Sequence, residues 1–296
     1  MILAAVTAFV KAPGTEYTVN AGQRAGGNEH RDDFPQPLYF ARRERSVIIL
    51  YAVLGLMAGA VINVLADVYP YRNKPVRGAV CPACGQPRTL LQSLAVLAFV
   101  SGRRRCPACG RPLAVRNLAV EIGVAALLVL LYSRYPDLVP LLIASFYTCV
   151  LVLVTVTDLE HRLIPNRAML PAIVIAALLS PLWFGPGWYL ALIGGVIGFG
   201  FFWVTVWLGG KLLGRGAMGE GDITLATFVG LITGFPGIII ALAVTIIAGG
   251  VISLALLLTR VVNLRGFIPY GPFIALGGFI TMLYGQQIMT RFFFGV

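Results

Sequence analysis

Charged residues are scarce in this chain: they make up 12% of its 296 residues, whereas hydrophobic residues make up 58%. A soluble globular domain carries about twice that share of charge. Long apolar runs recur instead, most of them near the length that crosses a bilayer. The composition therefore predicts an all-α, polytopic membrane protein. We expect about eight transmembrane helices, at residues 46–67, 118–134, 138–157, 168–184, 187–209, 223–234 (short for a span), 236–259 and 269–289.

Acidic residues are missing altogether from residues 68–117, which contain nine Arg and Lys residues. By the positive-inside rule this loop is cytosolic. Alternating threading then places the loops that carry Arg162, Lys211 and Arg260 on the same side, and only the segment ARRERS (41–46) departs from the rule. The net charge of +11 thus reflects membrane topology. Because the basic residues lie between apolar runs, we expect a lipid bilayer as partner and no nucleic acid.

The sequence divides into four parts. Residues 1–45 are polar, rich in Gly and mixed in charge, which predicts a disordered extension. Residues 46–67 form the first transmembrane helix, residues 68–117 a small cytosolic loop domain, and residues 118–296 the main membrane domain. The loop domain has too little apolar content to build its own core, and a bound metal is one substitute for a core.

Cysteine is also rare, yet four of the five cysteines fall in two matching units, CPACGQP (81–87) and CPACGRP (106–112). Two C-x2-C pairs separated by 21 residues predict a closed tetrahedral site for structural zinc. The Gly after each second Cys permits the positive φ that such turns need. Disulfides are the alternative, which a reducing cytosolic compartment disfavours. The predicted zinc ligands are Cys81, Cys84, Cys106 and Cys109.

The apolar stretch between the two cysteine units, LLQSLAVLAF (90–99), is too short to span a bilayer. We expect it either to lie on the membrane surface or to pack on the helix bundle. The fifth cysteine, Cys149, falls inside a predicted span, where a small buried thiol is the ordinary interpretation.

Only six acidic residues occur from residue 118 onward, and ionisable groups at membrane depth usually mark function. Two of them, Asp158 and Asp222, are predicted to lie at the cytosolic ends of two spans. Two neighbouring carboxylates do not both ionise easily, so one can hold a proton while the other accepts one from water. This arrangement predicts an acid–base pair that activates water against a peptide carbonyl. Gly219 and Gly221, without Cβ atoms, would let a substrate backbone approach.

Other interpretations of the acids remain open. Asp222 in GDITL has the position of a helix N-cap, and Glu160 and His161 can be ordinary interfacial residues. With only two histidines in the chain, a histidine-based site is not indicated. A protein of another class, a proton-coupled membrane transporter with a zinc-binding cytosolic loop, would also keep acids inside its bundle.

Six motifs in order resemble the type IV prepilin peptidases, membrane aspartyl proteases of the GxGD group. They are GLMAGAVINVLADVYP, the paired CPACG units, RNLAVEIG, TDLEHRLIPN, GEGDITLATFVGLITG and IPYGPFIALGG. The resemblance covers most of residues 50–290 and makes residues 118–296 the membrane aspartyl peptidase domain. It implies that Asp158 and Asp222 are the catalytic pair, without assigning which is the acid and which the base.

The resemblance also implies a function and a location. A protein of this family cleaves the leader of type IV prepilin or pseudopilin precursors at the cytosolic face of the bacterial inner membrane. It then N-methylates the new terminal residue with S-adenosylmethionine. No Gly-rich nucleotide-binding turn follows a strand pattern in the sequence, so the residues that bind the methyl donor are not assigned.

Overall fold

The computed structural model describes residues 37–68, 80–81, 83–212, 219–259 and 269–293. The expected disorder of residues 1–45 falls mainly on residues outside this set. The described residues are helical and contain no strand beyond two isolated bridges in the cysteine loop. The helices are α2 (Pro37–Val68), α3 (Leu90–Ser93), α4 (Ala95–Val100), α5 (Val115–Arg134), α6 (Leu138–His161), α7 (Asn166–Phe184), the 3-10 turn η1 (Gly185–Gly187), α8 (Tyr189–Leu212), α9 (Glu220–Thr233), α10 (Gly237–Leu258) and α11 (Gly271–Phe293).

Each of the eight predicted spans coincides with a helix, which confirms the all-α membrane fold. Six described helices are long and apolar enough to cross a membrane: α2 from Arg45, α5, α6, α7 to Gly187, α8 to Lys211, and α10. Helix α9 has 14 residues, too few for a span. Helix α11 is longer but carries Gln286 and Gln287 in its second half. The first helix begins at Pro37, earlier than the predicted residue 46.

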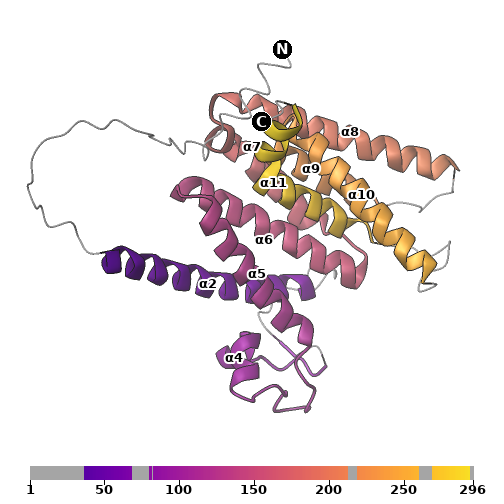
Figure 1. Cartoon of the computed structure of the whole chain (residues 1–296). Helices are drawn as coiled ribbons and strands as arrows, with labels where there is room; N and C mark the ends of the chain where they lie inside the picture. Colours follow the sequence, from indigo (N-terminus) through magenta and orange to yellow (C-terminus); the bar gives the residue numbers. More distant parts are fainter. Residues whose placement is uncertain (1–36, 69–79, 82, 213–218, 260–268, 294–296) are drawn as a thin grey trace, which may run out of the picture.

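Helix α6 occupies the centre of the bundle. In its most apolar stretch 56% of the residues are buried, against 22–33% in the other five candidate spans. One of its faces packs with α2 and α5, and the opposite face packs with α7, α9 and α11. Figure 1 shows α6 between the α2–α5 pair and the remaining helices. A polar residue near the end of α6 is therefore enclosed by protein and not by lipid.

Small residues allow two helix pairs to approach closely. A Cβ on Gly55 or Gly59 of α2 would lie 2.5 or 2.6 Å from backbone atoms of α5. A Cβ on Gly194 or Gly198 of α8 would lie 2.3 Å from backbone carbonyl oxygens of α9. Lipid provides no hydrophobic force between helices, so close van der Waals packing at small residues takes that role. This packing fixes α9, and with it Asp222, against the long helix α8.

Side-chain contacts sort the helix ends into two groups, as alternating threading predicts. At one end, α2 and α6 end and α5 begins around Arg116, and α11 begins beside Asp158. At the other end, Tyr135 after α5 donates a hydrogen bond to the Met282 carbonyl of α11. The first turn of α9, which carries Asp222, rests on Ile164 just after α6, so both predicted aspartates lie at the end of the bundle where α6 ends.

Candidate active site and cysteine cluster

Asp158 lies in the last turn of α6, and only 5% of its surface is exposed. Its Oδ2 atom accepts a hydrogen bond from the backbone N–H of Gly271 at 2.9 Å, at the first residue of α11. Just beyond, Arg162 ends the helix in the left-handed conformation, with φ of 51°. Pro165, three residues later, is the N-cap of α7.

Asp222 is equally buried, with 5% of its surface exposed, in the first turn of α9. The N-cap of that helix is Gly219, which makes no side-chain cap, so the interpretation of Asp222 as an N-cap is wrong. The carboxylate lies close enough to Asp158 for the two charges to interact. The N-terminal end of a helix carries partial positive charge, which favours a carboxylate in the first turn.

The segment between α6 and α7 brings the two aspartates together. A Cβ on Gly221 would lie 2.6 Å from Cβ of Ile164, so the first turn of α9 rests directly on this segment. Thr224 also donates a hydrogen bond to the Asn166 side chain at 3.3 Å. Close packing against Ile164 therefore explains why residue 221 is a glycine, independently of substrate binding. At Gly219 a Cβ would make only ordinary contacts, with the Asp222 carboxylate at 3.6 Å and the Gly221 backbone N at 4.0 Å, so this side of Asp222 is uncrowded.

Gly271→Ala tests the contact between α11 and Asp158. The added Cβ would lie 2.6 Å from Oδ2 of Asp158, so the carboxylate must move. If Asp158 takes part in catalysis, a shift of about 1 Å should lower the cleavage rate by about a hundredfold. Gly250→Ala is the matched control, since a Cβ there meets nothing within 4 Å. Peptide cleavage and thermal unfolding are measured for both; equal cleavage by both variants would contradict the expectation.

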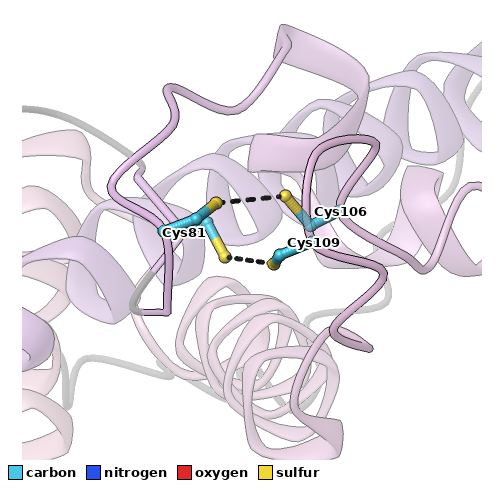
Figure 2. Close-up of side chains that lie close together, drawn as sticks. Cys81, Cys106 and Cys109 are labelled. Atoms are coloured by element: carbon cyan, nitrogen blue, oxygen red, sulfur yellow. Dashed lines mark hydrogen bonds between the residues drawn. The ribbon is translucent and has the colours of Figure 1, made fainter.

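The four cysteines of the loop form one cluster, in which all sulfur atoms lie within 4.8 Å of one another. Cys81 and Cys109 have sulfurs 3.6 Å apart, and those of Cys84 and Cys106 are 3.7 Å apart, well beyond a disulfide bond. Figure 2 shows the sulfurs of the two turns facing one another. A cluster of this kind could hold a metal ion, as the spacing of the motifs predicts.

The two turns that carry the cysteines have the same backbone geometry. In each, the N–H of the first cysteine donates to a carbonyl five residues later, and the glycine after the second cysteine donates back to the first. Gly85 and Gly110 have φ of 72° and 69°, which confirms the predicted need for positive φ. The duplicated turns therefore present two thiols each to a common point.

Backbone N–H groups favour the thiolate form of the first cysteine in each turn. Backbone N–H groups of Cys84 and of the residue before it lower the pKa of Cys81 to about 6. The equivalent groups of Cys109 and its neighbour lower the pKa of Cys106. Thiolates crowded into so small a volume repel one another, and a divalent cation relieves that repulsion.

Helix α4, within the predicted short apolar stretch, packs on the bundle. Glu121 of α5 is fully buried, and its two carboxylate oxygens accept hydrogen bonds from the backbone N–H groups of Ala95 and Val96, at 2.7 and 2.9 Å. Ala95 and Ala98 are buried by this contact, while Leu97 and Val100 face outward. The loop is thus attached to the second span by a carboxylate inside the protein.

Three contacts were not predicted from the sequence: that of Gly271 with Asp158, that of Glu121 with α4, and that of Arg116 with the ends of α2 and α6. Gly271 was visible only as part of the motif IPYGPFIALGG, Glu121 only as part of RNLAVEIG, and Arg116 only as one of many basic residues. A signal did exist for Glu121, because an acidic residue in an apolar helix requires a partner. For Gly271 and Arg116 the partners are distant in sequence, and the sequence alone does not identify them.

Two family models match the chain. The type IV leader peptidase family matches residues 145–254, which include both aspartates, and the bacterial peptidase A24 N-terminal domain matches residues 53–135, which include the four cysteines. The protein is therefore a multi-spanning membrane peptidase. The alternative of a proton-coupled transporter finds no support in these matches.

Relatives named prepilin leader peptidase/N-methyltransferase match over most of their length. The Aeromonas hydrophila protein is 31% identical over 227 residues, 77% of this chain and 78% of its own. The Bacillus subtilis (strain 168) protein is 30% identical over 71% of this chain and 83% of its own, and the Pseudomonas putida protein is 27% identical over 86% and 93%. This chain belongs to the type IV leader peptidase family. No solved structure matches it significantly.

Proposed function

We propose that the protein cleaves the leader peptide of type IV prepilin-like precursors at the cytosolic face of the bacterial inner membrane. Asp158 and Asp222 act as the acid–base pair. The observation that carries the proposal is the burial of both carboxylates at the same end of the bundle, close enough to interact. The relatives' names supply prepilins as the substrate class, and the family description supplies the type IV class. The resemblance of the motifs extends the proposal to pseudopilins.

The reaction requires only these two side chains and water. The ionised carboxylate takes a proton from a water molecule, whose oxygen attacks the scissile peptide carbonyl. The protonated carboxyl donates its proton to the leaving amine, so that the C–N bond breaks and the pair regains its single proton. The Gly271 N–H holds one oxygen of Asp158 and leaves the other for water.

We also propose N-methylation of the new amino terminus, with S-adenosylmethionine as the methyl donor, since the relatives' names include this activity. The proposal assigns no residue to the methyl donor. Purified protein incubated with a prepilin and S-adenosylmethionine should yield a product reduced by the mass of the leader and increased by one methyl group. An intact precursor after incubation would remove the proposal.

The cysteine cluster is proposed to bind structural zinc. Zn–S bonds are about 2.3 Å, so the sulfurs of a tetrahedral site lie about 3.8 Å apart. Two sulfur pairs, at 3.6 and 3.7 Å, fit that geometry, and all four sulfurs lie within 4.8 Å of one another. The chemistry of the donor set, four sulfurs in two turns, fits zinc. Zinc would neutralise the thiolates and hold the two turns together, with no position left open for catalysis.

The proposed orientation can be tested by labelling in intact cells. A cysteine introduced at Ser101, in the basic loop, should be shielded from an impermeant thiol reagent, whereas one at Trp188, in the link between α7 and α8, should react. Both positions are exposed in the structure, so only the membrane distinguishes them. The wild-type protein is the control for native thiols, and permeabilised cells should label at Ser101 too. The reverse pattern would invert the topology.

A further inference from the structure

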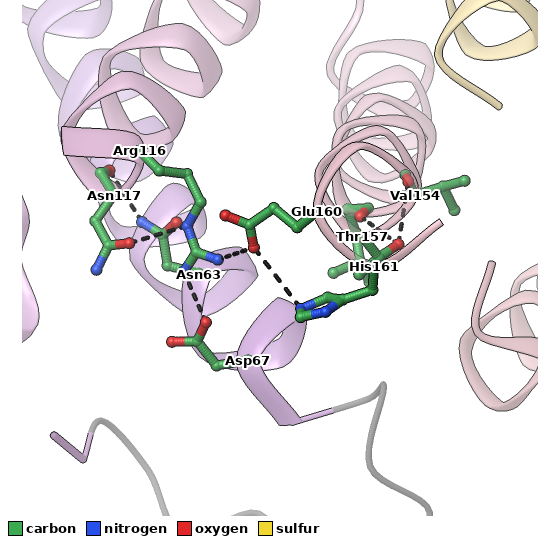
Figure 3. Close-up of polar contacts among 9 residues, drawn as sticks. Asn63, Asp67, Arg116, Asn117, Val154, Thr157, Glu160 and His161 are labelled. Carbon is green, nitrogen blue, oxygen red and sulfur yellow. Dashed lines mark hydrogen bonds and ion pairs between the residues drawn. The ribbon is translucent and has the colours of Figure 1, made fainter. Parts of the chain in front are cut away.

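One arginine holds the ends of three helices together (Figure 3). Arg116, in the first turn of α5, places its Nη2 atom 2.8 Å from the carboxylate of Asp67 in the last turn of α2. Its Nη1 atom donates to the carboxylate of Glu160 in the last turn of α6. The Arg116 side chain is 21% exposed, and those of Glu160 and Asp67 are 33% and 45% exposed, so the ion pair is partly buried. Such a pair is screened less than one on an open surface.

The guanidinium group is fixed in orientation. Its Nε atom donates to Oδ1 of Asn117 at 3.1 Å, while Asn63 of α2 donates to the backbone carbonyl of Asn117 at 3.0 Å. The planar guanidinium group of arginine can donate hydrogen bonds to two carboxylates and an amide at once, which the single ammonium group of lysine does not do. The geometry therefore depends on arginine and not merely on positive charge.

Glu160 stands two residues after Asp158, in the same final turn of α6. Residues two apart project from nearly opposite sides of a helix. Accordingly Glu160 is held by α5 on one side, and Asp158 is held by the N–H of Gly271 from α11 on the other. Helix ends fray readily. Two contacts on opposite sides prevent the last turn from rotating or unwinding.

We propose that Arg116, acting through Glu160, is a positioning residue that fixes the last turn of α6 and thereby the direction of the Asp158 carboxylate. The inference rests on the proposed catalytic role of Asp158. It assigns a positioning role to a residue in the first turn of α5, in the segment matched by the N-terminal family domain. The two family domains are thus joined at the peptidase site itself.

The experiment compares Glu160→Gln with Asp67→Asn in purified protein and a prepilin substrate. Each substitution removes the negative charge of one carboxylate that pairs with Arg116 and keeps the size of that side chain. Only Glu160 is on α6, so Glu160→Gln should lower kcat for cleavage about tenfold with KM unchanged, and Asp67→Asn should lower kcat much less. Asp137→Asn is the control, an exposed acid at the opposite end of α6 that makes no side-chain cap.

A double-variant cycle tests whether Arg116 affects kcat through Glu160. Arg116→Ala with Glu160→Ala should lose no more kcat than the worse of the two single variants, because the residues act as one unit. Thermal unfolding is measured for every variant, and Arg116→Lys should recover less than half of the lost rate. The inference is overturned if Glu160→Gln cleaves like wild type, if Asp67→Asn loses as much kcat, or if the losses in the double variant add.

Two reference proteins separate this inference from the proposed function. Wild type must cleave the prepilin, and Asp158→Asn must not. If wild type does not cleave the prepilin, or Asp158→Asn does, the proposed function is contradicted and this inference fails with it. With both references as expected, the Glu160 and Asp67 variants decide the inference alone.

Discussion

Asp158→Asn and Asp222→Asn are each expected to lower leader cleavage by at least about a thousandfold. Asparagine keeps the size of the side chain but neither accepts a proton from water nor donates one to the leaving amine. Both side chains are buried and lie close together, so neither role can pass to bulk water. Cleavage is measured from the mass of a prepilin incubated with each purified variant.

The double variant Asp158→Asn with Asp222→Asn should be no less active than either single variant, since one missing carboxylate already stops the reaction. Asp137→Asn should cleave like wild type. Circular dichroism and thermal unfolding establish that each variant is folded. Cleavage within tenfold of wild type by either single variant would remove that residue from the proposed pair.

The double variant Cys81→Ser with Cys84→Ser is expected to release about one zinc ion per chain and to reduce methylation much more than cleavage. The serines remove one pair of sulfurs from the cluster, and the remaining pair does not hold a structural ion tightly. The turn at Gly85 then loses its main support. The measurements are metal content, the mass of the product, and the rate at which the leader is removed.

The expected division of activities follows from where each group lies. Both aspartates are on helices whose backbone hydrogen bonds are satisfied within the helix, independent of metal. The cysteine turns have few backbone hydrogen bonds of their own and lie outside the bundle. If methyl transfer depends on the cysteine loop, as the family resemblance suggests, the product should be cut but unmethylated. Loss of cleavage with methylation retained would reverse the assignment, and wild-type protein without zinc would remove its premise.

Apolar runs predicted the positions of eight described helices, although α9 is too short to cross a membrane. The prediction succeeded because burial of apolar surface in lipid depends on local composition. The cysteine cluster could also be predicted, since its four ligands are encoded in two short motifs with fixed spacing. Alternating topology predicted that Asp158 and Asp222 lie at the same membrane face, which depends only on the order of the spans. These features are local, or depend only on the order of the spans.

Contacts between distant segments could not be predicted in the same way. The hydrogen bond between Gly271 and Asp158 joins residues 113 apart in sequence. From sequence Glu160 resembled an ordinary interfacial charge, and only the tertiary structure places Arg116 against it. A backbone N–H carries no sequence signal, and an arginine in a basic loop does not stand out from its neighbours. Such contacts require the packed bundle.

Glu121 has a consequence for the order in which the chain assembles. The carboxylate holds α4 by two backbone hydrogen bonds, yet it belongs to α5, which is synthesised later. A helix of six residues is not stable on its own in water. Residues 90–114 are therefore synthesised before the residue that anchors them, and α4 can dock only once α5 has been made. Attachment of the cysteine loop thus depends on a residue that follows it in the chain.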